Sequence, residues 1–228
     1  MIFPRSSARE IMDDVSIHGE PLDAALRELT IINRWLGGDT TSRKGVQSML
    51  RRIPATSAIS ILDAGAGGSD LVNALDGIHP AIRITSLDLN LGACRYSASI
   101  APGLQVVQGS LLALPFKTGA FDLVHVALVL HHFSEPELRS ILMDLSSLAR
   151  RGIIINDLRR SAFAYIGIKA LTALFSRSAM VRNDGPISVR RGFLRHELVR
   201  LCSTIPGMTI TIRRTWAFRW CVCLMKAG

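Results

Sequence analysis

The chain has 228 residues, a formal net charge of +9, 48% hydrophobic residues and four cysteines. This length favours one compact α/β domain with or without a small lid, and the apolar fraction excludes a disordered, collagen-like or coiled-coil chain. The cysteines form no C-x-x-C pair, and no Cys/His cluster has zinc-finger spacing. We therefore expect neither a disulfide scaffold nor a metal site, and a reducing, cytoplasmic location.

Most of the positive charge comes from scattered arginines, because lysine stands only at Lys44, Lys117, Lys169 and Lys226. A basic balance is compatible with nucleic-acid contact, but arginines at the ends of elements fit ordinary surface roles better. The first residues contain no apolar run of a secretory signal. The most apolar helical stretch, residues 162–175, contains Lys169 and is shorter than the ~20 residues that span a bilayer. We expect no nucleic-acid partner and no membrane span.

The first fifty residues predict helices. Helical spacing begins after Pro21 and recurs at Leu22, Ala25, Leu26, Leu29, Ile32 and Leu36. Gly37 and Gly38 end this helix, and a second helix is predicted over residues 42–52, before Pro54. We interpret residues 1–54 as an N-terminal helical lid.

From residue 58 onward, short apolar runs alternate with helical segments. The predicted strands cover residues 58–62, 82–87, 104–108, 121–126 and 152–157, and the predicted helices between them cover residues 69–75, 91–99 and 138–148. Strands that alternate with helices in this way predict a parallel sheet with helices on both faces.

This alternation ends after Asp157. The predicted segments that follow are an apolar helix over 158–178, a polar loop over 181–186 and a helix over 195–202. Two strand-like runs, 208–214 and 217–225, predict an antiparallel hairpin at one edge of the sheet. In the second run we expect Trp220 to pack on one face together with Trp216 and Phe218.

The fold class is therefore α/β, with a Rossmann-like, seven-stranded, mostly parallel sheet, helices on both faces and a small helical lid. Residues 55–228 form the main domain, with a helical insertion at about 158–195.

A glycine-rich turn follows the first predicted strand and precedes a helix. Glycines at positions 65, 67 and 68 let the backbone turn tightly and approach a ligand. Asp88 ends the next strand, 23 residues beyond Gly65, where a carboxylate can accept hydrogen bonds from both hydroxyls of a ribose. The arrangement predicts a nucleoside-binding site.

Two aspartates distinguish between possible cofactors. In a G-x-G-x-x-G fingerprint that starts at Gly65, the third glycine position is occupied by Asp70, and Asp63 immediately precedes the turn. These carboxylates oppose the binding of a pyrophosphate at the helix N-terminus. S-adenosylmethionine (SAM) carries no phosphate but has an ammonium and a sulfonium cation, so the residues favour SAM over a nicotinamide dinucleotide. A nicotinamide dehydrogenase stays an alternative.

In these segments the chain resembles the class I SAM-dependent methyltransferases. The matching motifs are Leu62–Gly67, Leu87–Asn90, Gln108–Phe116 and Phe121–Val124, and the resemblance covers residues 58–157. Leu128–Phe133 resembles the small-molecule branch that includes the ubiquinone/menaquinone biosynthesis methyltransferases. Ile31–Gly38 and Asn156–Arg160 are similar to methyltransferases found alongside bacterial type III polyketide synthases.

The resemblance implies a set of cofactor-binding residues. Asp63 is expected to reach the SAM ammonium, Asp88 to bind the ribose and Leu89 to pack on the adenine. Ser110 stands where the family usually has Asp or Asn. The full set is Asp63, Ala64, Gly65, Gly67, Asp88, Leu89, Gly109, Ser110, Leu111, Val126 and Ala127.

The sequence also contains candidates for proton transfer and substrate contact. His131 and His132 follow the fourth predicted strand, and either is a candidate general base because imidazole titrates near neutrality. The alternative is that the pair packs a helix start against the sheet. His125 lies within the strand and is expected to be a hydrogen-bonded core histidine. The candidate substrate contacts are Trp35, Arg159 and Arg160, although the arginines also fit a solvated surface.

The resemblance implies a SAM-dependent methyltransferase of secondary metabolism. It would transfer a methyl group to a small hydrophobic aromatic or polyketide-type substrate, with a hydroxyl oxygen as the first candidate. The alternatives are C-methylation of a quinone-like ring, an RNA or protein methyltransferase, and a SAM-binding protein without catalysis. Residues 126–129 lack the N/D-P-P-Y motif of enzymes that methylate flipped bases, which argues against a nucleic-acid substrate.

Overall fold

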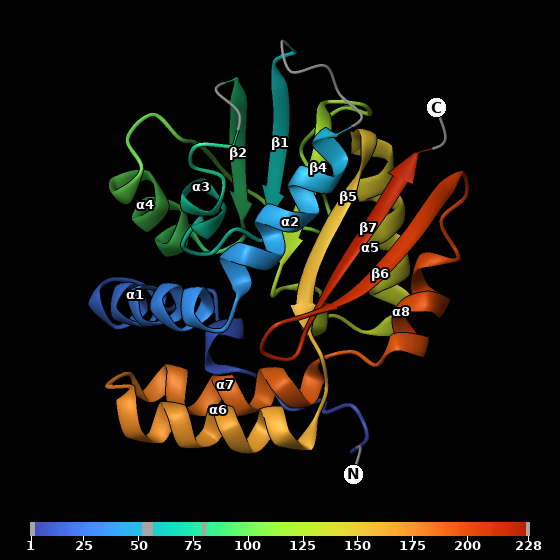
Figure 1. Ribbon diagram of the computed structural model, residues 1–228. Coiled ribbons are helices and arrows are strands. Elements are labelled where there is room, and N and C mark those ends of the chain that lie inside the picture. Colours follow the sequence, from blue (N-terminus) through green and yellow to red (C-terminus); the bar gives the residue numbers. More distant parts are fainter. Residues whose placement is uncertain (1–2, 52–56, 79–80, 227–228) are drawn as a thin grey trace.

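The computed structural model describes residues 3–51, 57–78 and 81–226, and a seven-stranded sheet lies at its centre (Figure 1). The strand order is β3-β2-β1-β4-β5-β7-β6. The strands are β1 (Ile59–Ala64), β2 (Ile82–Asp88), β3 (Gln105–Gln108), β4 (Phe121–Ala127), β5 (Ala149–Leu158), β6 (Met208–Thr215) and β7 (Arg219–Lys226). Strands β1 to β5 are parallel, whereas β7 runs antiparallel to β5 and to β6. The predicted fold class and the hairpin at the edge are confirmed.

Helices cover both faces of this sheet. One face carries α2 (Gly38–Leu50) and α3 (Asp70–Ala74), and the other carries α5 (Glu135–Leu148) and α8 (Arg195–Cys202). Helix α4 (Leu91–Ile100) packs beside β2 and β3. On the first face α2 lies very close to the sheet, because a Cβ at Gly45 would stand 2.5 Å from Cγ2 of Ile154.

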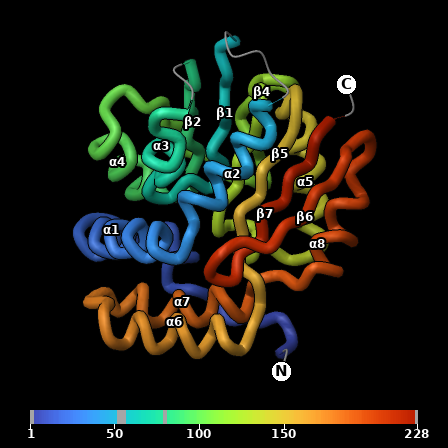
Figure 2. The backbone as a smooth tube through the Cα atoms, viewed as in Figure 1, coloured from blue at the N-terminus to red at the C-terminus, as the bar shows by residue number. Residues whose placement is uncertain are grey.

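Three further helices lie at the carboxyl edge of the parallel strands. They are α1 (Glu20–Trp35), α6 (Ala162–Phe175) and α7 (Ala179–Arg191), which lie below the strand ends in Figures 1 and 2. The N-terminal segment, with the short 3₁₀ helix η1 (Ile11–Asp13), runs between α7 and the sheet and closes the same edge. The predicted boundary between residues 54 and 55 falls outside the described residues.

One local prediction about the N-terminal half needs refinement. Helix α1 ends at Trp35, as the two glycines indicate, but α2 begins at Gly38 instead of residue 42. Gly37 has a φ of 74°, so the chain turns sharply and its carbonyl accepts the N–H of Thr41 at 2.9 Å. A left-handed residue of this kind reverses the chain and lets a new helix start at once.

The predicted polar loop over residues 181–186 is wrong, because these residues lie inside α7. Proline in a helix interior costs about 3 kcal/mol, so Pro186 must be outweighed by other contacts. The hydroxyl of Ser178 accepts the N–H of Val181 and caps the helix. The Asp184 carboxylate accepts the backbone N–H groups of Ile11 and Met12 at 2.8 and 3.0 Å, which ties α7 to the N-terminal segment.

The expected alternation of Trp216, Phe218 and Trp220 along one strand is also wrong. Trp216 and Phe218 belong to a tight turn between β6 and β7, in which Phe218 has a φ of 59°, and Trp216 is 74% exposed. Trp220 alone lies in the strand, and its indole N–H donates to the carbonyl of Phe193 at 2.9 Å.

None of the helices in the described part of the chain combines the length and the apolar character that crossing a membrane requires.

Candidate active site

A cavity of about 770 Å³ is lined by the carboxyl ends of the parallel strands and by helices α1, α6 and α7. Parallel α/β sheets bind their ligands at this edge. The predicted site residues that line it are Asp63, Gly65, Gly67, Asp88, Leu89, Gly109, Ser110, Leu111, Ala127, His131 and His132.

The turn after β1 requires glycine. Gly65 has a φ of 73° and Gly67 a φ of 51°, and both lie in the left-handed region. The N–H of Gly65 donates to the carbonyl of Leu87 at 2.8 Å, so the turn is tied to the end of β2. A Cβ at Gly65 would also stand 2.8 Å from both methyl groups of Val129. The turn is therefore held close to both neighbouring strand ends.

Asp88 at the end of β2 is positioned to bind a diol. Its Oδ2 accepts the N–H of Gly67 at 2.8 Å and its Oδ1 accepts the N–H of Asn90 at 2.9 Å. Each carboxylate oxygen can accept a further hydrogen bond. Burial raises the pKa of Asp88, and the nearby Asp63 adds to this effect, while the two backbone N–H groups oppose it. A ligand with two adjacent hydroxyl donors fits these oxygens.

Asp63 at the end of β1 is buried within a polar chain. Its Oδ1 lies 2.7 Å from Nδ1 of His125, and Nε2 of His125 lies 2.8 Å from the hydroxyl of Ser42 in α2. This confirms His125 as a hydrogen-bonded core histidine. The Asp63 carboxylate also faces the cavity, where a cationic group of a ligand can approach it. The lining thus combines two carboxylates, Asp63 and Asp88, beside the glycine-rich turn.

Ser110 forms a turn after β3. Its hydroxyl oxygen accepts the N–H of Leu112 at 3.1 Å, so the hydroxyl proton stays available for donation into the cavity.

Five of the predicted site residues do not line the cavity. Ala64 and Val126 lie fully buried in their strands, and Trp35 is 74% exposed on the outside of α1. The guanidinium of Arg159 stacks over the ring of Phe218 at 4.9 Å. Arg160 is buried in an ion pair with Glu197 at 2.6 Å and does not reach the cavity lining.

The apolar wall of the cavity comes from other residues. They are Leu29, Ile32, Leu36, Phe163, Ile168, Leu171, Trp216 and Phe218. Helix α6 and the β6–β7 turn supply most of the aromatic surface, whereas Trp35, the aromatic substrate contact expected from the sequence, does not line the cavity.

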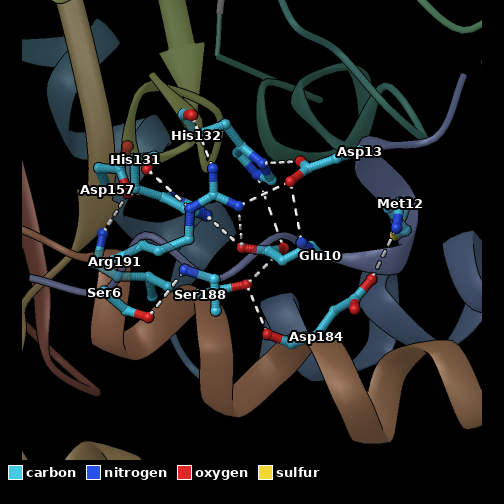
Figure 3. A network of polar contacts seen from close by, with 12 residues as sticks. Ser6, Glu10, Met12, Asp13, His131, His132, Asp157, Asp184, Ser188 and Arg191 are labelled. Carbon is cyan, nitrogen blue, oxygen red and sulfur yellow. Dashed lines mark hydrogen bonds and ion pairs between the residues drawn. The ribbon is translucent and has the colours of Figure 1, made fainter. Parts of the chain in front are cut away.

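His131 and His132 lie in a group of polar residues that we call the histidine cluster: Glu10, Asp13, His131, His132, Asp157 and Arg191 (Figure 3). Nδ1 of His131 lies 2.7 Å from Oδ1 of Asp157, and Nδ1 of His132 lies 2.5 Å from Oδ1 of Asp13. Both Nε2 atoms turn toward the Glu10 carboxylate, at 3.6 Å for His131 and 3.8 Å for His132.

Charges in the cluster perturb its titration. Burial opposes protonation of His131, but Asp157 and Glu10 outweigh burial and raise the pKa of His131 to about 9. Burial opposes ionisation of Asp13, yet its hydrogen bonds with His132 and Arg191 hold the pKa of that carboxyl well below the usual range. The Arg191 guanidinium donates to Asp13 at 2.9 Å and to the carbonyl of His132 at 2.7 Å.

The sequence analysis missed Glu10, Asp13 and Arg191. These residues are separated from the two histidines by 59 to 122 positions, and no local spacing connects them. The acidic residues of the N-terminal segment are a weak sequence signal for these members of the cluster. Only the packing of this segment on α7 places them beside the histidines.

A family model described as a methyltransferase domain matches residues 61–152. These residues contain the glycine-rich turn, Asp88 and both histidines of the cluster. No curated protein matches the chain in sequence.

Solved structures share the fold at low sequence identity. The plantazolicin methyltransferase BpumL with S-adenosylhomocysteine (SAH) has a TM-score of 0.66 at 13% identity, over 96% of this chain and 99% of that one. The magnesium protoporphyrin IX methyltransferase ChlM of Synechocystis with bound SAH has a TM-score of 0.58 at 17% identity, over 84% of each chain. A SAM-dependent methyltransferase from Aquifex aeolicus reaches 0.58 at 15% identity, over 79% of this chain and 89% of that one. At these identities the likeness establishes the fold.

Proposed function

We propose that the chain is a SAM-dependent methyltransferase that transfers the methyl group to a hydroxyl oxygen of a small, apolar acceptor. The observation that carries this proposal is the division of the cavity. Asp63, Asp88 and the glycine-rich turn come from the ends of β1 and β2, whereas α1, α6 and the β6–β7 turn add aromatic and aliphatic side chains. Four members of the histidine cluster also line the cavity: Glu10, Asp13, His131 and His132.

The charge of the lining supports a small acceptor over a nucleic acid. Among the described residues that line the cavity, one carries a guanidinium, Arg219, and eight carry carboxylates: Glu10, Asp13, Asp39, Asp63, Asp70, Asp88, Glu137 and Asp184. A phosphate backbone needs Lys and Arg contacts, so this lining disfavours RNA despite the overall charge. The relatives BpumL and ChlM are named for plantazolicin and magnesium protoporphyrin IX, which also supports a small-molecule acceptor.

In the mechanism that we propose, SAM supplies a methyl group on a sulfonium that leaves as a neutral thioether. Asp88 binds the ribose hydroxyls and Asp63 binds the ammonium, which aligns the donor. Phe163 and Trp216 bind the apolar body of the acceptor and exclude water from its reacting oxygen. Alignment and water exclusion supply most of the rate enhancement in such a transfer.

The acceptor hydroxyl must lose its proton, and we propose Nε2 of His132 as the proton acceptor. His132 is less buried than His131 and its ring lines the cavity. The hydrogen bond from Nδ1 to Asp13 directs the other nitrogen toward Glu10 and the cavity, as in other carboxylate–histidine pairs. Asp13 then acts as a positioning residue, and His131 supports the ring of its neighbour at a centroid distance of 4.4 Å. C-methylation of a quinone-like ring uses the same donor site, but it gives the histidines no hydroxyl proton to remove.

We also propose that the N-terminal segment, α1 and the α6–α7 pair form the lid. The Glu28 carboxylate of α1 accepts the N–H groups of Arg177 and Ser178, which joins α1 to the loop between α6 and α7. In contrast, α2 packs on the sheet. Because Arg177 is exposed, tryptic cleavage at this loop should slow when SAH and an acceptor are bound.

Calorimetric titration of SAH tests the donor site. We expect SAH to bind and NADH to give no heat. Asp88→Asn should weaken SAH binding at least tenfold, because a neutral amide is a poorer acceptor for two hydroxyls. Asp144→Asn, an exposed aspartate of α5, is the matched control and should bind SAH normally. NADH binding without SAH binding would refute the donor site.

Labelled SAM with a panel of phenols, hydroxylated polyketides and tRNA tests the acceptor class. Methyl ethers of apolar phenols that disappear in His132→Gln support the proposal. Labelled tRNA, or a product methylated only at carbon, contradicts it.

A further inference from the structure

We infer that Glu10, His131 and His132 form a binding site for a divalent transition-metal ion, with Zn²⁺ as the best match. No metal site was expected from the sequence, because no Cys/His cluster has zinc-finger spacing, and Glu10 lies more than 120 positions from the two histidines. The structure brings one carboxylate and two imidazoles together at the end of the cavity beside η1 (Figure 3).

The distances fit a shared ion. One ligand atom from each residue can be chosen so that all three lie within 4.8 Å of one another. Nε2 of His131 lies 3.6 Å from Oε1 of Glu10, and Nε2 of His132 lies 3.8 Å from Oε2. Ligands at 2.0–2.2 Å from a tetrahedral Zn²⁺ stand roughly 3.4 Å apart, so each imidazole is already within about 0.4 Å of that spacing from its own Glu10 oxygen. Binding one shared ion requires the three groups, which lie up to 4.8 Å apart, to close by about 1 Å.

Each of the three ligands is oriented by a partner on its outer side. The two Nδ1 atoms are bonded to the carboxylates of Asp157 and Asp13. The hydroxyl of Ser188 donates to Oε2 of Glu10 at 2.9 Å. Histidines that ligate metals commonly donate their second ring N–H to a carboxylate, which fixes the tautomer and aims the free nitrogen at the ion. This arrangement occurs twice here.

Nε2 of His131 is the second observation. The residue is only 3% exposed, and this nitrogen has no hydrogen-bond partner among the described residues. Its distance of 3.6 Å to Glu10 is longer than a hydrogen bond. An unsatisfied buried polar atom is costly, and an ion between the ring and the carboxylate would satisfy it.

The charge of the surroundings also favours a dication. The cluster contains three carboxylates, from Glu10, Asp13 and Asp157. One guanidinium, that of Arg191, is in direct contact with them. Arg5 is the next cation, and it donates to the carbonyl oxygens of His131 and Phe133 instead of to these carboxylates. The competing occupant is a proton between His131 and Glu10, which supplies only one positive charge.

Two imidazoles and one carboxylate select the kind of ion. Mg²⁺ and Ca²⁺ prefer oxygen ligands, whereas imidazole suits Zn²⁺ and its first-row neighbours. Three protein ligands leave a coordination position for a small oxygen ligand, as in catalytic zinc sites. All three residues line the cavity, so this position is open to the acceptor hydroxyl. A role of the ion in methyl transfer rests on the proposed function. With an ion bound, Nε2 of His132 would be a metal ligand and could not accept the proton of the acceptor hydroxyl. The ion would then lower the pKa of that hydroxyl.

Titration of the metal-stripped full chain with Co²⁺ tests the inference, because cobalt replaces zinc and absorbs visible light when it is four-coordinate. We expect one equivalent to bind, with absorption typical of nitrogen and oxygen ligands, and Zn²⁺ to displace it. Glu10→Gln and His132→Gln keep the size and the polarity of the side chains and should each weaken Co²⁺ binding at least 100-fold. His196→Gln is the matched control, because this histidine is exposed on α8.

The absence of cobalt uptake by the folded wild-type chain would overturn the inference and assign the cluster to a proton. Uptake that both ligand variants retain, or that shows a sulfur-to-cobalt band from the cysteines, would overturn it as well. If Glu10→Gln unfolds because it loosens the N-terminal segment, His132→Gln carries the test alone. SAH calorimetry on the same samples separates the two proposals, since cobalt binding without SAH binding refutes only the donor site, and the reverse refutes only the metal site.

Discussion

Replacing Gly65 by alanine probes how tightly the glycine-rich turn is held. Gly65→Ala has two costs that the structure separates. The φ of 73° lies in the left-handed region, which costs an alanine about 1–2 kcal/mol. The new methyl group would also stand 2.8 Å from both Cγ atoms of Val129, and such overpacking costs about 1–3 kcal/mol. We expect a total loss of about 3 kcal/mol in the free energy of unfolding.

Two further variants separate these costs. Gly207 has a φ of 68°, and a Cβ at this position would have no atom within 4 Å. Gly207→Ala should therefore lower the free energy of unfolding by only about 1–2 kcal/mol, the backbone cost alone. Combining Gly65→Ala with Val129→Ala should recover the steric part, seen as a coupling energy of about 1–2 kcal/mol in the double-mutant cycle.

Urea unfolding measures the stabilities, and calorimetry with SAH measures the effect on the site. A displaced turn misaligns the N–H of Gly67 that positions Asp88, so Gly65→Ala should bind SAH at least tenfold more weakly. Equal losses in Gly65→Ala and Gly207→Ala, with no coupling to Val129, would refute the argument from close packing.

Three other predictions concern Asp88, Arg160 and Trp220. Burial raises the pKa of Asp88 above the ordinary 3.8, so its carboxylate is protonated at a higher pH than usual. SAH affinity should fall as the pH drops through this raised pKa, and calorimetry on Asp88→Asn should no longer show this pH dependence. Arg160→Met leaves Glu197 without its cation and should cost about 3 kcal/mol in urea unfolding without changing SAH affinity, and a weaker affinity would restore Arg160 as a ligand contact. Trp220→Phe removes the hydrogen bond to Phe193 and should lower stability by about 1–3 kcal/mol, whereas an unchanged midpoint would contradict this contribution.

The sheet and the glycine-rich turn at its carboxyl edge could be predicted because their signals are local. The apolar runs that became β1, β2 and β4 are short and end in residues with an evident role, such as Asp63 and Asp88. A buried parallel strand followed by a tight turn is recognisable within about ten residues of sequence. The spacing from Gly65 to Asp88 corresponds to the turn, the helix and the second strand of one β-α-β unit.

The acceptor side could not be predicted because distant contacts determine it. Pro186 and its polar neighbours indicate a loop, yet the Asp184 carboxylate and two backbone N–H groups more than 170 positions away keep them helical. Arg160 was predicted to face a substrate because it follows a strand, but its partner Glu197 comes from a helix that the local pattern does not connect to it. Both features depend on a polar side chain whose partner lies on another element.

The overall charge and the cavity charge illustrate the same difference between composition and placement. A net charge of +9 is a property of the whole chain and acts through the outer surface, where arginines such as Arg150 and Arg151 stand at half-exposed positions. Arg5, Arg160 and Arg191, in contrast, are wholly or partly buried, and they donate hydrogen bonds to carbonyl oxygens and carboxylates. The cavity itself is acidic. Its field therefore favours ligands with a cationic centre, such as the sulfonium and ammonium of SAM, and a metal ion at the histidine cluster, while it repels the anionic partners that the composition suggests.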